Sequence, residues 1–426
     1  MSTDPARHTA TDPAQLIGDI ARRARRAQGV LAAMPSAARA AALHRAADAL
    51  RAATPAILAA NAQDLAAGKA NGLSTAMLDR LALDAARIAA IAAGVAAVAD
   101  LPDPVGQVIE AYERPNGLKM QRIRVPIGTI GIIYESRPNV TADAAALCVM
   151  AGNAALLRGG SEAVHSNRAI HAALMSGLAE GGVSENAVQL IPTQDRACVG
   201  AMLTASGLID MIVPRGGKGL VARVQADARV PVLAHLDGIC HTYVHAAADP
   251  EMARSIALNA KLRRTGICGA METLLIDADF PAAPALVAAL IDAGCEVRGD
   301  ERIAALDPRI IPASANDWDT EYLDAILSVA MVDGLDAALD HIARHSSAHT
   351  DVIVTADNAA AERFLASVDS AIVMHNASSQ FADGGEFGLG AEIGIATGRL
   401  HARGPVALEG LTTYKWQVRG HGQTRP

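Results

Sequence analysis

Aromatic side chains, positive charge and closely spaced cysteines are scarce in this sequence. Aromatic residues make up only 3 % of the 426 residues, so Ala, Leu, Ile and Val must fill the interior. The formal net charge of −8 argues against nucleic acid as the main partner, because phosphate backbones require a basic surface. The five cysteines are widely spaced and include no CxxC motif, so neither a disulfide framework nor a zinc site is indicated.

Long uncharged apolar runs are also missing. No stretch of about 18 such residues occurs, so a transmembrane helix is not expected. The opening residues, MSTDPARHTATDPAQ, lack the apolar core of a secretory signal, and residues 1–13 are expected to form a disordered tail. A cytoplasmic protein is the simplest interpretation. Apolar residues make up 51 % and charged residues 19 %, as in globular chains, and the length predicts two or three domains.

The N-terminal quarter and a short segment after it have different patterns. Residues 14–100 are rich in alanine with arginines at helical spacing, which predicts several helices with solvated faces. In 107–125, two alternating extended runs flank Pro115-Asn116-Gly117, and Asn-Gly between such runs predicts a hairpin. This hairpin is polar on both faces, so it is expected to project and pair with another subunit. The partly extended tail, 404–420, is a second candidate partner.

Short apolar runs alternate with helix-like segments from residue 129 onward. Such alternation predicts a parallel sheet with helices on both faces, and ligands of such sheets bind at the carboxyl ends of the strands. A second alternation begins after residue 238 and predicts a second α/β domain. The expected strands are 129–135, 154–158, 187–192, 209–214 and 230–236 in the first domain and 272–276, 325–332, 351–356 and 370–375 in the second.

Three polar or glycine-rich turns follow strands expected in the first domain. Arg158, in the turn RGGSE at 158–162, and the helix start behind it suit an anionic phosphate. The turn PRGGKG, which contains Gly216 and Gly217, is similar, but neither turn has GxGxxG spacing and both are equally explained as plain turns. Asn139, in the turn ESRPN, offers an amide that can stabilise an oxyanion, although a turn asparagine is the simpler interpretation.

The segment KLRRTGICGAMETLLI, residues 261–276, carries the strongest candidate for chemistry. Cys268 follows two arginines, and the pKa of a nucleophilic thiol falls near cations. Gly266 and Gly269 permit unusual backbone angles and close approach of a substrate. An ordinary buried cysteine is the alternative. The other four cysteines lie in apolar, Ala-rich or strand-like segments and are interpreted as core or surface filler.

The segment HSSAHTDVIV, residues 345–354, places His345, His349 and Thr350 before an expected strand. Two histidines at this spacing that lead into a strand have poor geometry for metal binding. A polar loop that faces the substrate is therefore favoured over a metal site. A loop held only by its own hydrogen bonds is the alternative.

Together these segments closely resemble the gamma-glutamyl phosphate reductase family, relatives of the aldehyde dehydrogenases that act in the second step of proline biosynthesis. The resemblance runs from about residue 15 to residue 420 and is most specific in YESRPNVT, LRGGSEA and LHARGPV. It implies an aldehyde dehydrogenase-like α/β fold with three parts. These are a Rossmann-like NADP-binding domain (1–104 and 126–237), an α/β catalytic domain (238–372), and a small β oligomerisation element with the C-terminal segment (105–125 and 373–426).

The resemblance also implies roles for individual residues. Cys268 matches the nucleophile that forms a thioester, and Asn139 matches the oxyanion-hole asparagine of aldehyde dehydrogenases. Arg264 is the first candidate to assist phosphate departure, Lys218 the second. No metal is expected. The implied NADPH contacts are Arg158, which would meet the 2′-phosphate, Gly159, Ser161, Glu162, Gly216 and Gly217, and the candidate substrate contacts are Arg264, His349 and Thr350.

The implied reaction is NADPH-dependent reduction of L-glutamyl 5-phosphate to L-glutamate 5-semialdehyde, by a homo-oligomer with a functional link to glutamate 5-kinase. Two features depart from the related patterns. Arg264-Thr265-Gly266-Ile267 precedes the nucleophile and Gly269 follows it, where many members have Arg-Pro-Ser before and Asn after. Aldehyde dehydrogenases that hydrolyse their thioester carry a glutamate where this chain has the shorter Asp237, so no strong water-activating base is expected and the thioester is protected.

Three alternatives belong to other functional classes. A hydrolytic NAD(P)-dependent aldehyde dehydrogenase shares the fold but needs the missing base. A cysteine hydrolase or acyltransferase would use Cys268 with His345 or His349 and no nucleotide. A non-catalytic binding protein would not need a glycine-flanked cysteine behind two arginines.

Overall fold

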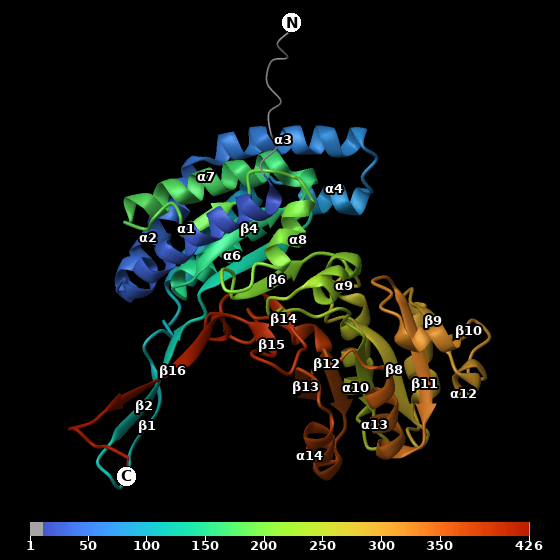
Figure 1. The fold of residues 1–426 in the computed structure, drawn as a ribbon. Helices are drawn as coiled ribbons and strands as arrows, with labels where there is room; N and C mark the ends of the chain where they lie inside the picture. Colours follow the sequence, from blue (N-terminus) through green and yellow to red (C-terminus); the bar gives the residue numbers. More distant parts are fainter. Residues whose placement is uncertain (1–11, 426) are drawn as a thin grey trace, which may run out of the picture. The chain divides into compact units, whose positions relative to one another are not determined.

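The computed structural model describes residues 12–425, in which the chain forms two compact units (Figure 1). The first unit runs to Leu233 and also takes up Leu389–Gly394 and the chain from Val406 onward, and the second comprises Ala234–Gly388 and Ile395–Pro405. The three-part division by function stays a prediction. Of the predicted tail, residues 1–11 lie outside the described part. Asp12 and Pro13 are not tail residues, because Asp12 caps the first helix and Pro13 begins it.

A four-stranded parallel sheet with the order β5-β4-β3-β6 forms the centre of the first unit. Most of its side chains are buried, which explains its unbroken apolar runs. These strands confirm four of the five predicted for this region. The fifth prediction, 230–236, is wrong, because only Val232 pairs there, in a single bridge to Ile212. The strands are β3 (Thr129–Tyr134), β4 (Ala154–Gly159), β5 (Val188–Leu190) and β6 (Met211–Arg215).

Helices α1, α4 and α5 of this unit begin at side-chain caps, and α2 and α7 pack closely through small residues. The Asp84 carboxylate accepts the Arg87 N–H at the start of α5. Helix α2 approaches α7 so closely that a Cβ at Gly177 would lie 2.5 Å from the Ala46 Cα. The predicted helical region is confirmed. The helices are α1 (Pro13–Ala33), α2 (Ser36–Ala52), α3 (Thr54–Ala70), α4 (Thr75–Leu81), α5 (Ala85–Ala99), α6 (Val140–Met150), α7 (Val164–Glu180), α8 (Ala197–Leu203) and α9 (Lys218–Asp227).

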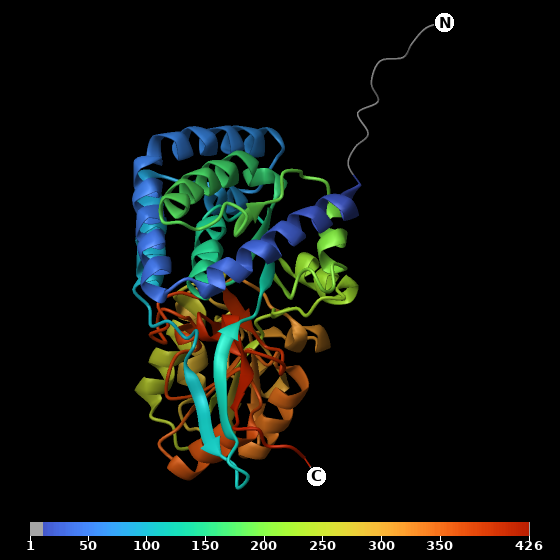
Figure 2. The same cartoon turned by 60° about the vertical axis from the view of Figure 1, so that its left-hand side comes forward.

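A separate three-stranded antiparallel sheet contains the predicted hairpin. Strands β1 (Val108–Glu113) and β2 (Lys119–Pro126) lie side by side in Figure 2, and Gly117 in their turn has φ +83°. Strand β16 (Thr412–Arg419) pairs with the other edge of β2. The predicted pairing between the tail and the hairpin is therefore confirmed.

The second unit is built on a seven-stranded parallel sheet with the order β10-β9-β11-β8-β7-β12-β13. Its two faces bury alternate residues: Leu274 and Ile276 pack in a cluster with α10 and α11, and Leu275 packs in a cluster with α13 and α14. The predicted second α/β domain is confirmed. Its strands are β7 (Cys240–Val244), β8 (Met271–Asp277), β9 (Glu296–Gly299), β10 (Ile311–Pro312), β11 (Ile326–Val332), β12 (Thr350–Val354) and β13 (Ile372–His375).

The helices of this unit connect successive parallel strands. They are α10 (Pro250–Leu262), α11 (Ala283–Asp292), α12 (Glu301–Ala304), α13 (Gly334–His345) and α14 (Asn358–Ser367), and two further short strands are β14 (Gly394–Ala396) and β15 (Gly404–Val406). None of the helices within residues 12–425 is long and apolar enough to cross a membrane.

Candidate active site

Cys268 lies in the loop that joins α10 to β8 in the second unit. It is partly buried, whereas Cys148, Cys198, Cys240 and Cys295 are buried. Burial raises the pKa of Cys148 to about 12 and that of Cys295 to about 11, so neither thiol is a nucleophile at neutral pH. Their interpretation as core residues therefore agrees with their surroundings.

Two residues on the entry to β7 hold the backbone of Cys268. The Cys240 thiol donates to the Cys268 carbonyl oxygen at 3.1 Å. A Cβ at Gly238 would lie 2.6 Å from the Cys268 Cα and would overlap its carbonyl oxygen. The loop around Cys268 is thus packed directly on the Gly238 backbone, with no room for a side chain between them.

A short 3-10 helix, η3 (Ser379–Phe381), fixes the same loop from another side. The Ser379 hydroxyl donates to the Gly269 carbonyl at 2.7 Å. The Gln380 amide donates to the carbonyls of Arg264 at 3.1 Å and of Ala260 at 2.9 Å. Ser379 and Gln380 are buried, so these bonds are shielded from water and restrain the loop on both sides of Cys268.

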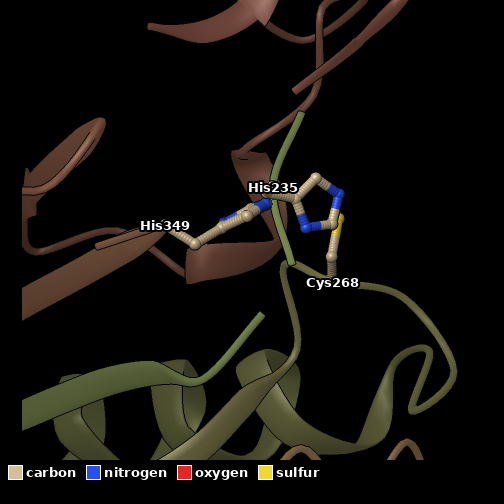
Figure 3. Close-up of side chains that lie close together, drawn as sticks. All are labelled: His235, Cys268 and His349. Atoms are coloured by element: carbon tan, nitrogen blue, oxygen red, sulfur yellow. The ribbon is translucent and has the colours of Figure 1, made fainter. Parts of the chain in front are cut away.

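Two histidines lie beside the Cys268 side chain (Figure 3). His349 ends the segment before β12, and His235 precedes Gly238; their ring centroids are 5.1 Å apart. The two rings and the Cys268 sulfur present ligand atoms that all lie within 4.8 Å of one another. Burial lowers the pKa of His349 to about 3, with a further contribution from His235, so this imidazole is neutral at physiological pH.

In the structure, Thr350 and His345, the other two candidate residues of the HSSAHT segment, contact different groups. Thr350 is buried and its hydroxyl lies 2.9 Å from His349 Nδ1, so this side chain orients His349. The His345 Nδ1 lies 2.9 Å from the Asp319 carboxylate, and its ring packs against His341. Arg264 is exposed. Substrate contacts by Arg264, His349 and Thr350 stay predictions.

Asn139 is the N-cap residue of α6 in the first unit. Its amide donates one hydrogen to the Asp143 carboxylate at 2.8 Å, which fixes the orientation of the amide. An amide carries two N–H donors, so one donor is left for another acceptor. Burial raises the pKa of Asp143 to about 6. The oxyanion role of Asn139 stays a prediction.

A cavity of about 270 Å³ lies at the carboxyl ends of β3 and β4, bordered by the turn at 158–162 and, through Gly219 alone, by the turn at 214–219. The Arg158 guanidinium donates to the carbonyls of Gly159 at 3.2 Å and Gln194 at 3.0 Å. Its buried Nε has no hydrogen-bond partner among the described residues, and burial lowers its pKa. The cavity lining includes Arg158, Ser161, Glu162, Arg196 and Arg223, whereas the predicted cofactor residues Gly159, Gly216 and Gly217 do not line it.

Two glutamate carboxylates accept hydrogen bonds from the turns that follow β3 and β6. Glu162 accepts a hydrogen bond from the Ser136 hydroxyl at 2.9 Å. Glu135 accepts the Gly217 N–H at 3.1 Å, and a Cβ at Gly216 would overlap the Glu135 carboxylate. Only glycine therefore fits at position 216 while the Glu135 carboxylate lies beside it. The Gly217 N–H, in the turn that precedes α9, points toward this carboxylate.

Sequence reasoning missed four residues of the Cys268 surroundings. They lie 28–33 positions before or 111–112 positions after the cysteine, and they come together only when the sheet of the second unit forms. The four residues are His235, Cys240, Ser379 and Gln380.

Comparison with known proteins decides the family. The sequence model of the aldehyde dehydrogenase family matches residues 4–301. The gamma-glutamyl phosphate reductase of Novosphingobium aromaticivorans is 74 % identical over 427 residues, which is 100 % of both chains. The chain belongs to the gamma-glutamyl phosphate reductase family. Members of this family are oxidoreductases with the aldehyde dehydrogenase fold, so both predictions are confirmed.

Solved structures agree with this assignment. The crystal structure of gamma-glutamyl phosphate reductase from Thermotoga maritima has a TM-score of 0.94 and 41 % identity, covering 96 % of this chain and 100 % of the other. An acetylating aldehyde dehydrogenase from Geobacillus thermoglucosidasius has a TM-score of 0.70 at 17 % identity, over 98 % of this chain and 100 % of its own. The second comparison supports the fold alone.

Proposed function

We propose that the protein reduces L-glutamyl 5-phosphate with NADPH to L-glutamate 5-semialdehyde and phosphate, the second step of proline biosynthesis. The observation that carries this proposal is the full-length match to gamma-glutamyl phosphate reductases at 74 % identity. The restrained, partly buried Cys268 supplies the nucleophile that such a reaction needs.

In the proposed mechanism, the Cys268 thiolate attacks the acyl carbon of the substrate. A C–S bond forms while the carbonyl pair moves to oxygen, and the backbone N–H of Cys268 and the Asn139 amide stabilise that oxyanion. Collapse of the intermediate breaks the bond to the phosphate oxygen and leaves a thioester. Gly238, Cys240 and Gln380 act as positioning residues, because they fix the loop that carries the sulfur.

The residues of the first-unit cavity fit an anionic nucleotide. The orphaned Nε of Arg158 and the neighbouring Arg196 and Arg223 offer positive charge in one place. Arg158 is proposed to meet the 2′-phosphate, Ser161 and Glu162 the ribose, and Gly216 and Gly217 the pyrophosphate. When bound there, NADPH supplies the hydride that converts the thioester carbonyl to the aldehyde level, after which Cys268 leaves as the thiolate. No metal is required for these steps.

The reverse reaction tests the proposal most directly. The protein is supplied with glutamate 5-semialdehyde and NADP⁺, and NADPH formation is followed with and without inorganic phosphate. Strict dependence on phosphate is expected, because phosphate and not water resolves the thioester. Equal rates without phosphate would identify a hydrolytic aldehyde dehydrogenase, and no NADPH in either case would favour a cysteine hydrolase.

Two substitutions complete this test. Cys268→Ala should abolish turnover while leaving NADPH binding intact, and Cys295→Ala, at a buried cysteine of the same unit, serves as its control. Arg158→Ala should raise the KM for NADPH by at least about tenfold and change the KM for NADH little, since a charge-assisted hydrogen bond contributes about 1.5–3 kcal/mol. An equal effect on both cofactors would contradict the role given to Arg158.

A homo-oligomer and a functional link to glutamate 5-kinase, which makes the substrate, belong to the same proposal. The three-stranded sheet carries exposed apolar side chains at Tyr112, Tyr414 and Trp416, which supports an assembly through this sheet. Size-exclusion chromatography of Trp416→Glu should show a smaller particle than the parent protein. The predicted location, the cytoplasm, is likewise part of this proposal.

A further inference from the structure

Two histidines converge on Cys268, the proposed nucleophile, and all three side chains can bind a metal ion. Cys268 lies in the loop before β8, His235 lies in the segment before β7, and His349 lies immediately before β12. Their ligand atoms all lie within 4.8 Å of one another, and Figure 3 shows the His235 ring beside the sulfur and the His349 ring on the other side of His235. His349 is fully buried, yet its Nε2 has no hydrogen-bond partner within residues 12–425. A buried imidazole nitrogen without a partner carries a cost that a ligand would relieve.

The contacts around His349 are compatible with a metal-binding tautomer. Its Nδ1 lies 2.9 Å from the Thr350 hydroxyl and 3.6 Å from the Cys240 sulfur. Both of these groups can accept a hydrogen bond. With the imidazole proton on Nδ1, Nδ1 donates to the Thr350 hydroxyl and the lone pair on Nε2 is available to a metal ion. A metal-binding histidine is oriented in the same way, with its second ring nitrogen donating to a neighbouring group.

We propose that His235, Cys268 and His349 form an inhibitory site for a thiophilic divalent cation, with Zn²⁺ as the best match. One thiolate and two imidazoles are a ligand set that zinc accepts, with water as the fourth ligand. Ligand atoms on a tetrahedral zinc ion are about 3.3–3.7 Å apart, given Zn–N and Zn–S distances of about 2.0–2.3 Å. The ligand atoms therefore need to close in by at most about 1.1–1.5 Å to bind one ion.

Binding of the cation replaces the thiol proton, which passes to solvent, by a bond between sulfur and metal. No oxidation or reduction is involved, so a chelator reverses the process. While the cation is bound, the sulfur lone pair that attacks the acyl carbon is occupied, and the enzyme is inactive. The ion is an inhibitor and not a cofactor, so the expectation that catalysis needs no metal is unchanged. His345, the partner first considered for His349, takes no part, since it lies against Asp319.

Co²⁺ binding to the full-length, reduced protein tests the site without substrate or nucleotide, so its result is independent of the proposed reaction. One Co²⁺ per chain is expected, with a sulfur-to-cobalt charge-transfer band in the near ultraviolet and visible bands of four-coordinate cobalt, and Zn²⁺ should displace it. Cys268→Ser should remove the charge-transfer band. His235→Ala should weaken Zn²⁺ binding by at least about tenfold, because loss of groups that merely orient metal ligands already costs about 10–100-fold.

His44→Ala, at an exposed histidine paired with Asp100 in the first unit, is the matched control and should bind Zn²⁺ as the parent protein does. Circular dichroism verifies that each variant is folded. A charge-transfer band that survives in folded Cys268→Ser would overturn the proposal. Equal Zn²⁺ affinities of His235→Ala and His44→Ala would overturn it as well, as would a parent protein that binds no Co²⁺.

Discussion

Gly238 lies against the backbone of Cys268 so closely that no side chain fits between them. A Cβ at position 238 would approach the Cys268 Cα to 2.6 Å. We expect Gly238→Ala to displace the sulfur and to lower kcat by about 100-fold, since a misplacement of about 1 Å at a reacting group can cost that much. Steady-state kinetics with glutamate 5-semialdehyde, NADP⁺ and phosphate measure the effect.

Gly29→Ala is the control for this substitution. Gly29 is an exposed residue of α1, and a Cβ there would meet nothing within 4 Å. Its activity should equal that of the parent protein. Near-normal turnover of Gly238→Ala would show that the Cys268 loop tolerates displacement, and the positioning role of Gly238 would then be wrong.

Gln380 makes a second prediction about the same loop. Its amide donates to the carbonyls of Ala260 and Arg264, and Gln380→Leu leaves both acceptors without this donor. The loss of about 1–3 kcal/mol of buried hydrogen bonding should loosen the loop and lower kcat about tenfold, with an unchanged Kd for NADPH. Phe381→Ser, at the exposed neighbour on η3, is the control. A change in NADPH binding with constant kcat would contradict the prediction.

The ion pair between Lys261 and Glu272 stabilises the two ends of the segment that carries Cys268. Nζ and Oε2 are 2.6 Å apart, and both side chains are fully buried. Lys261→Met leaves the Glu272 carboxylate buried without its partner and should lower the free energy of unfolding by about 3–5 kcal/mol. Adding Glu272→Gln should restore most of this loss, because the neutral amide keeps an acceptor for the Leu323 N–H. Urea denaturation measures both variants, and a double variant as unstable as Lys261→Met would contradict this account.

The buried His349 predicts a dependence of stability on pH. Burial lowers the pKa of His349 to about 3, below its ordinary value of 6.5, while His235 lowers it further and Asp351 raises it. Below pH 6.5 the unfolded chain therefore takes up a proton that the folded chain does not. Stability falls as the pH falls toward 3, by about 1.4 kcal/mol per pH unit for this residue.

In His349→Gln the loss of stability between pH 7.5 and pH 5 should be smaller by about 2 kcal/mol, the integral of that slope below pH 6.5. Urea midpoints at the two pH values measure it, and His44→Gln, at an exposed histidine, is the control. The prediction fails if His349→Gln and His44→Gln lose equal stability on acidification.

Much of the fold could be predicted because the local pattern and the final environment agree. The runs at 129–135 and 272–276 contain consecutive apolar residues, Ile132-Ile133 and Leu274-Leu275-Ile276, as expected of strands covered on both faces, and they form β3 and β8. The run 230–236 has the same composition but forms one bridge at Val232. Pro231 and His235 interrupt it, and a sequence pattern does not reveal whether a neighbouring strand is available to pair with it.

Only part of the candidate site could likewise be predicted from the sequence. Cys268 could be singled out because its glycines and arginines are adjacent in the chain. Ser379 and Gln380 could not, because their contacts with the Cys268 loop arise from tertiary packing between distant segments. His349 shows why. In the sequence, the nearest histidine to His349 is His345, but in the structure the His235 ring packs against His349 and His345 lies against Asp319.

The pairing of β16 with β2 also has a consequence for the order of events during synthesis. Arg124 and Thr412, whose side chains are hydrogen-bonded where these strands meet, are 288 positions apart in the chain. The hairpin leaves the ribosome early, and one edge of β2 must wait unpaired until almost the whole chain has been translated. Unpaired edges promote association between chains, so this interval is when the hairpin is most open to pairing with another chain.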